Sequence, residues 1–364
     1  MAADYKSLCS AIASSDDKTV RSLIRRKHEL VSHWKPLCDA AFLGQPQYVE
    51  ALLRAGADPN QRAGTASRHT PLTRITQYHK TIPRHEGHLR CVELLLKHGA
   101  DPLQVGGPLS WQPIIYATVG PNLDFIQQLR SYNSNDLFTA CALHDLAQID
   151  EQLTHQSATS IDSQGYSPLH YVSVSGMWRV MNPNQSLDCA RILLDAGSLV
   201  DAVYGIPEGA EVFSATPLWF AVAHSENDAL AEFLLGNGAD PNVAVFAATY
   251  RGDLKILELL HKYGADWNQK FAGETPIMEL FRYRRTKVVP WLLAHGARAT
   301  DTDKKQRTLI HLAAIYGARE PILSALVAHG VDVSTRDAEG VLPLEYAREH
   351  SRKDVVKFLE RACN

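Results

Sequence analysis

A phrase of about 33 residues recurs along this chain and constrains its fold more than any other feature. One copy opens with Thr-Pro-Leu at 216–218 and closes with Gly-Ala-Asp-Pro-Asn at 238–242. Later copies place their closing glycines at 264, 296 and 330, with spacings of 32 and 34 residues. A period of this length predicts a repeat of two helices and a hairpin. Such units bury their apolar faces on their neighbours, so the sequence predicts a solenoid that works by holding a partner.

Signals inside each copy indicate where its helices begin and end. In the Thr-Pro opening, threonine supplies an N-cap and proline occupies the first turn, where its missing N–H is not needed. The second helix ends at a glycine that adopts the left-handed conformation, as at 92–99 and 256–264. By these signals, units open at Pro36, Thr70, Gln112, near Leu137, at Ser167 and Thr216, near Val243, and at Thr275, Thr308 and Leu342.

About eleven such units fit the chain, which predicts an all-α solenoid with β-hairpin-like loops and two insertions between helices. We expect capping repeats at 1–35 and 342–364, because the ends of a stack need a polar outer face. Between them we predict three segments: repeats at 36–111 with an insertion at 80–88, degenerate short repeats at 112–160, and repeats at 161–341 with an insertion at 177–186 and a long loop at 203–214.

The degenerate copies lack the Gly-Ala-Asp run and are shorter than the others. A stack is held together by the interfaces between neighbouring units, so a weak unit can divide it into separate cooperative blocks. We therefore expect 1–105 and 160–364 to be better ordered than 112–158.

The composition is that of an ordinary soluble protein, with a net charge of −3 and 21% charged residues. No global field therefore steers the chain toward nucleic acid or membrane. The six cysteines are scattered without a C-x-x-C pair, which predicts buried free thiols in a reducing compartment, the cytoplasm or nucleus. The opening residues lack a secretory profile, and no run of about 18 apolar residues occurs, so we expect no membrane span.

Several of these motifs together resemble the ankyrin-repeat family. The matching residues lie at 167–170 (S-P-L-H), 216–218 (T-P-L), 309–314 (L-I-H-L-A-A), and 56–60 and 238–242 (G-A-D-P-N). The resemblance implies L-shaped units of two helices and a hairpin, stacked into a curved array. It also implies protein binding through the hairpin tips and the concave side of the first helices, with no catalytic activity and no cofactor. The histidines at 170 and 311 are expected to make structural hydrogen bonds between repeats.

The resemblance also indicates which side chains face the concave groove: those after the paired alanines of each first helix, and those just before each Thr-Pro opening. The candidates are rich in Tyr, Trp and Arg, which are enriched at binding hot spots. They are Trp34, Tyr78, Trp111, Tyr166, His224, Tyr250, Arg251, Arg282, Tyr283, Arg307 and Tyr316. The alternative is that some of the tyrosines pack between neighbouring first helices.

The densest basic run lies at 282–287, and with Arg251 and Arg307 it could form one positive ledge. An acidic or phosphorylated protein segment, or nucleic acid, could dock on such a ledge. We favour an acidic protein partner, because a nucleic-acid binder normally has a more basic overall balance. The alternative is a solvated turn, which is also how we interpret the acidic pairs at 16–17 and 301–303.

Two insertions contain further candidates. Trp178 lies beside Met177 and Met181, and either folds back onto the adjoining loop or anchors a partner. His79, His85 and His88 could ligate zinc, but no second ligand cluster supports them, so we expect no metal.

No catalytic motif of the common hydrolase, protease or nucleotide-binding kinds occurs. We therefore predict a monomeric, non-catalytic adaptor that binds a protein partner through its groove and loops. One alternative is an inhibitor or delivered effector that blocks a target enzyme with its long loops. Another, which we favour less, is a nucleic-acid binder that uses the basic ledge.

Overall fold

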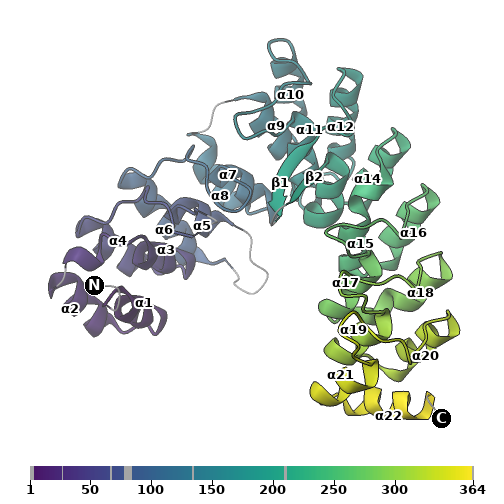
Figure 1. Cartoon of the computed structure of the whole chain (residues 1–364). Coiled ribbons are helices and arrows are strands. Elements are labelled where there is room, and N and C mark those ends of the chain that lie inside the picture. The colour runs from purple at the N-terminus through teal and green to yellow at the C-terminus, as the bar shows by residue number, and fades with distance from the viewer. Residues whose placement is uncertain are drawn as a thin grey trace. The chain divides into compact units, whose positions relative to one another are not determined.

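The structure is a computed structural model that describes residues 4–26, 28–65, 68–77, 84–132, 135–208 and 211–362. It divides into two compact units, Met1–Ala202 and Val203–Asn364. Within these described residues, twenty-two α-helices follow one another as eleven pairs, as the repeat count predicts (Figure 1). The boundary between the units lies at 202/203, and the degenerate copies at 112–158 form regular helix pairs inside unit 1.

Unit 1 contains six helix pairs in the described ranges, with two short 3₁₀ segments, η1 and η2. In each pair the odd-numbered helix comes first. The elements are α1 (Asp4–Ala13), α2 (Asp17–Arg26), η1 (His28–Leu30), α3 (Trp34–Phe42), α4 (Pro46–Arg54), α5 (Pro71–Thr76), α6 (Glu86–Lys97), α7 (Pro113–Val119), α8 (Leu123–Arg130), α9 (Leu137–Leu143), α10 (Leu146–Leu153), α11 (Pro168–Val174), η2 (Met177–Arg179) and α12 (Gln185–Asp195).

Unit 2 opens with an antiparallel hairpin and continues as five helix pairs in the described ranges. Strands β1 (Tyr204–Glu208) and β2 (Glu211–Ala215) pair with Tyr204 opposite Ala215. The helical elements are α13 (Pro217–Phe220), η3 (Ala221–Ser225), α14 (Asp228–Gly236), η4 (Pro241–Ala244), α15 (Val245–Arg251), α16 (Leu254–Lys262), α17 (Pro276–Arg282), η5 (Thr286–Val288), α18 (Val289–Ala294), α19 (Leu309–Tyr316), α20 (Glu320–Ala328), α21 (Pro343–Glu349) and α22 (Lys353–Ala362).

First helices contact first helices of the next pair within each unit. In unit 1 the contacts run from α1 to α3 and onward to α11, and in unit 2 from α15 to α17, α19 and α21. Side chains such as Leu72, Ile114 and Leu169 are almost completely buried between them. None of the helices in the described ranges is long and apolar enough to cross a membrane.

The helix starts confirm the capping predictions. Thr70 accepts a hydrogen bond from the N–H of Thr73 through its hydroxyl, at 3.1 Å. His311 accepts from the N–H of Thr308 at 3.1 Å, and its other ring nitrogen lies 3.2 Å from the carbonyl oxygen of Val341 in the next hairpin. His170 accepts from the N–H of Ser167 in the same way. The expected hydrogen bond between repeats is therefore confirmed for His311, whereas His170 makes the helix-capping bond within its own repeat.

Asparagines fasten successive hairpins to each other. Asn60, at the end of a Gly-Ala-Asp-Pro-Asn run, donates to the carbonyl of Gly99 at 2.8 Å and accepts from the N–H of Asp101 at 2.6 Å. Asn268 makes the same pair of bonds to Gly296 and Arg298. These bonds place each hairpin tip relative to the next one along the stack.

Aspartates close three hairpin turns of the described chain. One carboxylate oxygen of Asp162, Asp303 or Asp337 accepts from the backbone N–H groups two and four residues later, at 2.9–3.0 Å. Asp303 is only 7% exposed, so the interpretation of 301–303 as a solvated turn is wrong at this residue. Burial alone would raise the pKa of Asp303, but hydrogen bonds from Arg307 outweigh it and lower the pKa below its ordinary value.

One first helix departs from regular α geometry. After one turn as α13, the chain widens into the π-helical segment η3, at the end of which Glu226 takes a left-handed conformation with φ of 50°. The N–H of Asn227 then bonds to the carbonyl of Ala221 at 3.0 Å. A π segment is an insertion within a helix and is frequent at functional sites.

Candidate protein-binding groove of unit 2

The first helices and hairpins of unit 2 enclose an open groove of about 310 Å³. Six aromatic side chains and two alanines provide most of its lining. We call it the aromatic groove and define it by Phe213, Trp219, Ala223, Phe246, Ala247, Tyr250, Phe271, Glu279 and Tyr283. These residues come from β2, α13, η3, α15, the hairpin before α17, and α17 with its C-cap.

Local structure turns these rings away from the core. On α13, Leu218 and Phe220 are fully buried, whereas Trp219 between them is only half-buried. On α15, Val245 fills the core and Phe246 beside it is half-buried in the groove. Helical side chains that are adjacent in sequence point in different directions, so a fully apolar segment must expose part of its surface.

The hairpins supply the other two phenylalanines. Phe271 exchanges two backbone hydrogen bonds with Glu274, both at 3.0 Å, which fixes the hairpin tip. Its ring meets Phe213 of β2 almost perpendicularly, with centroids 5.7 Å apart, and Phe213 lies 5.3 Å from Trp219. Such tilted and perpendicular contacts are favourable geometries for aromatic pairs.

Two exposed tyrosines form the outer wall of the groove. Tyr250 and Tyr283 are 45% and 50% exposed, and their rings meet perpendicularly with centroids 5.3 Å apart. The guanidinium of Arg285 lies 3.8 Å from the centroid of Tyr250 and donates to the Tyr250 carbonyl oxygen at 2.6 Å. The sequence placed both tyrosines at equivalent groove positions, and in the structure they lie together at one surface.

One acidic side chain lies among the rings of the groove. Glu279 is the one charged residue among the described residues that line it. His224 lies beside Trp219, with ring centroids 5.1 Å apart, and burial lowers the pKa of its imidazole to about 4. His224 is therefore neutral near pH 7 and adds no positive charge to the rim.

Three of the arginines of the expected basic ledge have carboxylate partners. Arg251, whose side chain is 14% exposed, bonds to Asp228 at 2.9 Å and Asp253 at 3.2 Å. Arg307 bonds to Asp303 at 2.7 Å. Arg282 pairs with Glu274. Because each positive charge is balanced locally, these three arginines do not add up to a ledge of uncompensated charge.

Other candidate residues lie elsewhere. Trp111 and Tyr166 are 2% and 1% exposed inside unit 1, so they pack between helices as the alternative interpretation held. Trp34, also in unit 1, is half-buried with its ring 5.6 Å from His33. Tyr316 is half-buried on α19. Tyr78 lies outside the described residues.

The insertion after α11 folds back onto its own unit. Met177 is 5% exposed, and its N–H donates to the hydroxyl of Ser175, which in turn donates to the carbonyl of Ala142 at 2.7 Å. Trp178 is half-buried, with the Arg179 guanidinium 4.9 Å from its ring centroid. Of the two alternatives for this insertion, packing against the adjoining chain therefore describes Met177.

The histidines of the other insertion serve as helix caps where they are described. His85 accepts from the N–H of Gly87 at 3.1 Å, and His88 lies 3.1 Å from the carbonyl oxygen of Phe42. His79 lies outside the described residues. Within the described ranges, no group of three or more His, Cys, Asp or Glu side chains could hold a metal ion.

Four aromatic residues of the groove are not among the binding candidates taken from the sequence: Phe213, Trp219, Phe246 and Phe271. The repeat rule selects positions near the ends of first helices, whereas these lie at helix starts and in hairpins. One signal in the sequence indicates them: aromatic residues are concentrated at 213–220. Phe213 precedes the Thr-Pro opening, and Trp219 and Phe220 follow it.

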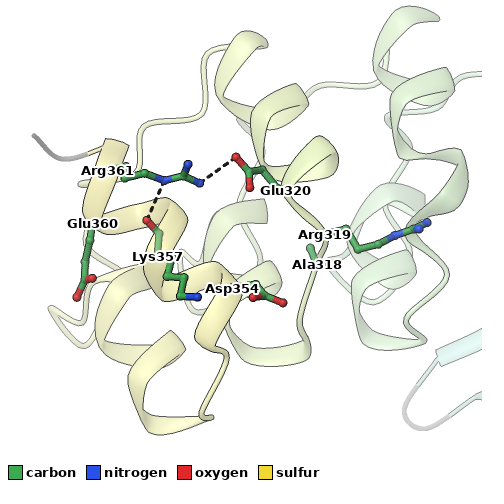
Figure 2. Close-up of a pocket in the computed structure, with 7 residues that line it drawn as sticks. All are labelled: Ala318, Arg319, Glu320, Asp354, Lys357, Glu360 and Arg361. Carbon is green, nitrogen blue, oxygen red and sulfur yellow. Dashed lines mark hydrogen bonds and ion pairs between the residues drawn. The ribbon is translucent and has the colours of Figure 1, made fainter.

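A second hollow, of about 760 Å³, lies between α20 and α22 at the C-terminal end of unit 2. Figure 2 shows Arg361 reaching from α22 toward Glu320 on α20, at 2.9 Å. Its lining mixes both signs of charge: Ala318, Arg319, Glu320, Asp354, Lys357, Glu360 and Arg361. We call it the charged cleft. Exposed pairs of this kind are weak, and the mixture favours no particular ligand charge.

Comparisons with known proteins agree with this architecture. The family model described as three copies of ankyrin repeats matches 218–303 and 244–337, and the single ankyrin-repeat model matches 33–63 and 69–106. The groove lies mostly inside the first of these regions.

Relatives share the repeats over part of the chain. Inversin from Homo sapiens is 31% identical over 175 residues, which are 44% of this chain and 16% of inversin. Cyclin-dependent kinase 4 inhibitor B from Rattus norvegicus is 32% identical over 132 residues, or 35% of this chain and 98% of that protein. NF-kappa-B inhibitor delta from Mus musculus is 29% identical over 140 residues, covering 38% of this chain and 39% of that protein. Because the family models cover more than half of the sequence and coincide with the helix pairs, the chain belongs to the ankyrin-repeat family.

Proposed function

We propose that this chain is a non-catalytic adaptor or scaffold that binds a protein partner, and that a segment of the partner lies in the aromatic groove. The observation that carries the proposal is the gathering of six partly exposed aromatic side chains in one open groove. Aromatic surface is costly to leave in water, and contiguous exposed patches mark interaction sites. Trp and Tyr also dominate the energy of measured interfaces.

The experiment is a selection of binding peptides from a random display library with the whole chain as bait. Affinities of the selected peptides are then measured for the native chain, a Trp219→Ala/Phe246→Ala double variant, and Tyr132→Ala. Tyr132 is a matched control because it is 52% exposed and is not among the residues that line the groove. We expect the double variant to lose about tenfold or more in affinity, as hot-spot residues do, and the control to lose none.

Circular dichroism and thermal unfolding establish that each variant keeps its fold. Peptides that bind the double variant as tightly as the native chain would show that the groove is not the binding surface. The same peptides, mapped by cross-linking, would then show where the surface lies.

A second candidate function is inhibition of an enzyme by the long loops. What favours it is similarity to two proteins that are named inhibitors, of cyclin-dependent kinase 4 and of NF-kappa-B. Deleting 177–186 is a poor test, because Met177 is part of the core. The better variant is Trp178→Ala, which a groove adaptor tolerates and a loop-based inhibitor does not.

The paired arginines bear on the choice of partner. Arg251, Arg282 and Arg307 are each bonded to carboxylates, so the positive charge that this rim offers an acidic protein segment comes from the exposed Arg284, Arg285 and Lys287. Buried free thiols at Cys9, Cys38, Cys91, Cys141 and Cys189 are typical of cytoplasmic and nuclear proteins, and we propose that location.

A further inference from the structure

We infer that Arg285, which lies over Tyr250 at the wall of the aromatic groove, binds a carboxylate side chain of the partner segment, and that an apolar side chain beside that carboxylate enters the groove. This inference rests on the proposed function, that a protein segment occupies the groove, and it assigns the chemistry of two neighbouring residues in that segment. Two features carry it: the way in which Arg285 is held, and the balance of charges around it.

Arg285 is held in place by one residue of the groove wall. Its guanidinium carbon lies 3.8 Å from the ring centroid of Tyr250, and one of its N–H groups donates to the carbonyl oxygen of the same residue at 2.6 Å. A long exposed side chain ordinarily loses rotational freedom when it binds a ligand, and this loss weakens binding. Because Tyr250 already restricts Arg285, a ligand of this arginine has less ordering to impose.

The contact with Tyr250 leaves the binding edges of the guanidinium open. The N–H donors of a guanidinium lie in its plane, and a carboxylate binds them edge-on through two parallel hydrogen bonds. The ring of Tyr250 lies against the face of that plane, and the Tyr250 carbonyl accepts from one of the donors. Among the described residues no carboxylate forms an ion pair with Arg285, so its other donors can bind one from a partner.

Two more cations lie in the same turn. Arg284 precedes Arg285 directly, and Lys287 follows two residues later at the start of the next helix. Both are exposed, and neither is paired with a carboxylate in the described ranges. The turn therefore carries positive charge that attracts an acidic segment and orients it as it approaches.

The carboxylates of this rim, by contrast, are engaged. Glu274 pairs with Arg282, and two aspartates share Arg251. Glu279, which lines the groove itself, is half-buried and interacts within the chain. An acidic side chain inside the groove would lie among apolar rings and near the Glu279 carboxylate, which is unfavourable. The carboxylate of the partner therefore belongs at the turn, and its apolar neighbour belongs among the rings.

The test uses three display libraries that differ only in a fixed central residue: glutamate, glutamine or lysine. The whole chain is the bait. We expect groove-dependent binders mainly from the glutamate library, and replacement of the fixed glutamate by glutamine should weaken them about tenfold, because a charged hydrogen bond becomes a neutral one. Their affinity should also fall as salt is added, since the cations of the turn are exposed to solvent.

Variants of Arg285 test whether this residue makes the contact. Arg285→Gln should weaken the glutamate peptides about tenfold and should make them insensitive to the change from glutamate to glutamine, because the two changes remove one shared interaction. Arg285→Lys keeps the charge but loses the planar group, and should weaken them about threefold or more. Losses that simply add in the doubly changed pair would overturn the contact between Arg285 and the fixed glutamate.

Arg336→Gln is the matched control. Arg336 is also exposed and also donates to a backbone carbonyl oxygen at 2.6 Å, that of Gly340, but it is not among the residues that line the groove. This variant should bind the glutamate peptides as tightly as the native chain does. Thermal unfolding of each variant checks that the fold survives.

The two proposals fail in different ways. Groove-dependent binders found mainly in the glutamine or lysine library would overturn the carboxylate assignment and leave the groove as a protein-binding site. Binders from any library that ignore Trp219 and Phe246 would instead refute the groove itself. Sedimentation of the chain alone tests a further occupant: self-association that the Trp219→Ala/Phe246→Ala variant abolishes would assign the groove to a second copy of the chain and overturn both proposals.

Discussion

Unit 1 and unit 2 each contain an aromatic cluster beside a hairpin, and the two clusters differ in exposure. In unit 1, Trp111, Tyr116 and Tyr166 are all nearly fully buried, with the Trp111 ring 5.3 Å from Tyr116 and 6.0 Å from Tyr166. We call these three residues the closed cluster. In unit 2, by contrast, every aromatic ring of the groove keeps part of its surface accessible.

The hairpins account for the difference. In the closed cluster, the Tyr116 hydroxyl donates to the carbonyl of Gly106 and the Tyr166 hydroxyl donates to that of Leu109, each at 3.0 Å. The hairpin backbone therefore lies over the two tyrosines and accepts hydrogen bonds from their hydroxyls. Position in the repeat alone therefore does not determine whether an aromatic residue is exposed to a partner or buried in the stack. The length and path of the adjoining hairpin determine it.

The largest expected effect is on stability, from a matched pair of tryptophans. Trp111→Ala should lower the free energy of unfolding by about 3–5 kcal/mol, because it opens a cavity in the closed cluster. Trp219→Ala should cost about 1–2 kcal/mol, because its ring is only half-buried. Urea unfolding followed by circular dichroism measures both. Equal losses would mean that the groove is as tightly packed as the closed cluster.

Acid should weaken unit 1 more than unit 2. Burial lowers the pKa of His69, His88 and His144 in unit 1 to about 4, whereas in unit 2 only His224 falls that far among the described histidines. These rings stay neutral in the fold, while the unfolded chain takes up protons below its ordinary pKa of 6.5. Their stability contribution is thus complete above pH 6.5 and is lost as the pH falls toward 4.

Hydrogen exchange at pH 7 and pH 5, corrected for intrinsic rates, compares the two units. His144→Asn provides the control, because asparagine tolerates the left-handed conformation found at residue 144 (φ 53°) and does not titrate. It should reduce the pH dependence of unit 1. Equal acid sensitivity in both units would contradict the assignment.

A smaller effect concerns the degenerate copies. The sequence predicts faster hydrogen exchange at 112–158 than at 1–105 or 160–364, because these copies lack the Gly-Ala-Asp hairpin. Tyr116 of the closed cluster lies within this stretch, and its buried ring should slow exchange there. The measurement therefore shows which effect on the exchange rate is larger, that of the missing hairpin or that of the buried ring. Exchange that is slower at 112–158 than on both flanks would show that the buried rings have the larger effect.

The smallest effect is expected at the charged cleft. Arg361→Ala removes the 2.9 Å pair with Glu320, in which both side chains are mostly exposed. It should change the free energy of unfolding by less than about 0.5 kcal/mol, since water and salt screen such pairs. The affinity of groove-binding peptides should stay the same. A loss above about 1 kcal/mol would show that the charged cleft stabilises the end of the stack.

Much of the fold could be predicted because its signals are local. Thr70, Ser167 and Thr308 begin helices wherever the sequence indicates, and the paired helices follow from the repeat. The burial of Trp111 and of Asp303 could not be predicted, because each depends on the path of a hairpin that the repeat leaves variable. The sequence predicts the least ordered stretch at 112–158, whereas the boundary between the compact units lies at 202/203, just before the β1–β2 hairpin.

The candidate site was predictable only at its outer wall. Tyr250 and Tyr283 recur at one repeat position, so the pattern indicates them. Phe213 and Phe271 come from hairpins that have no fixed register with the helices, and their meeting at 5.7 Å is a property of the folded stack. The pairing of the arginines with carboxylates likewise depends on residues from different turns.

The π segment η3 supplies Ala223 to the groove, and it allows the number of residues at this part of the rim to change. It holds more residues than an ordinary turn, so a one-residue deletion within 221–225 would restore a regular helix instead of breaking one. The helical turns before and after the segment would keep their facing, because the π turn already absorbs the additional residue, so Leu218 and Phe220 would stay buried. Such a deletion would therefore reshape the rim of the groove at Ala223 while Trp219 and the core residues beside it keep their places.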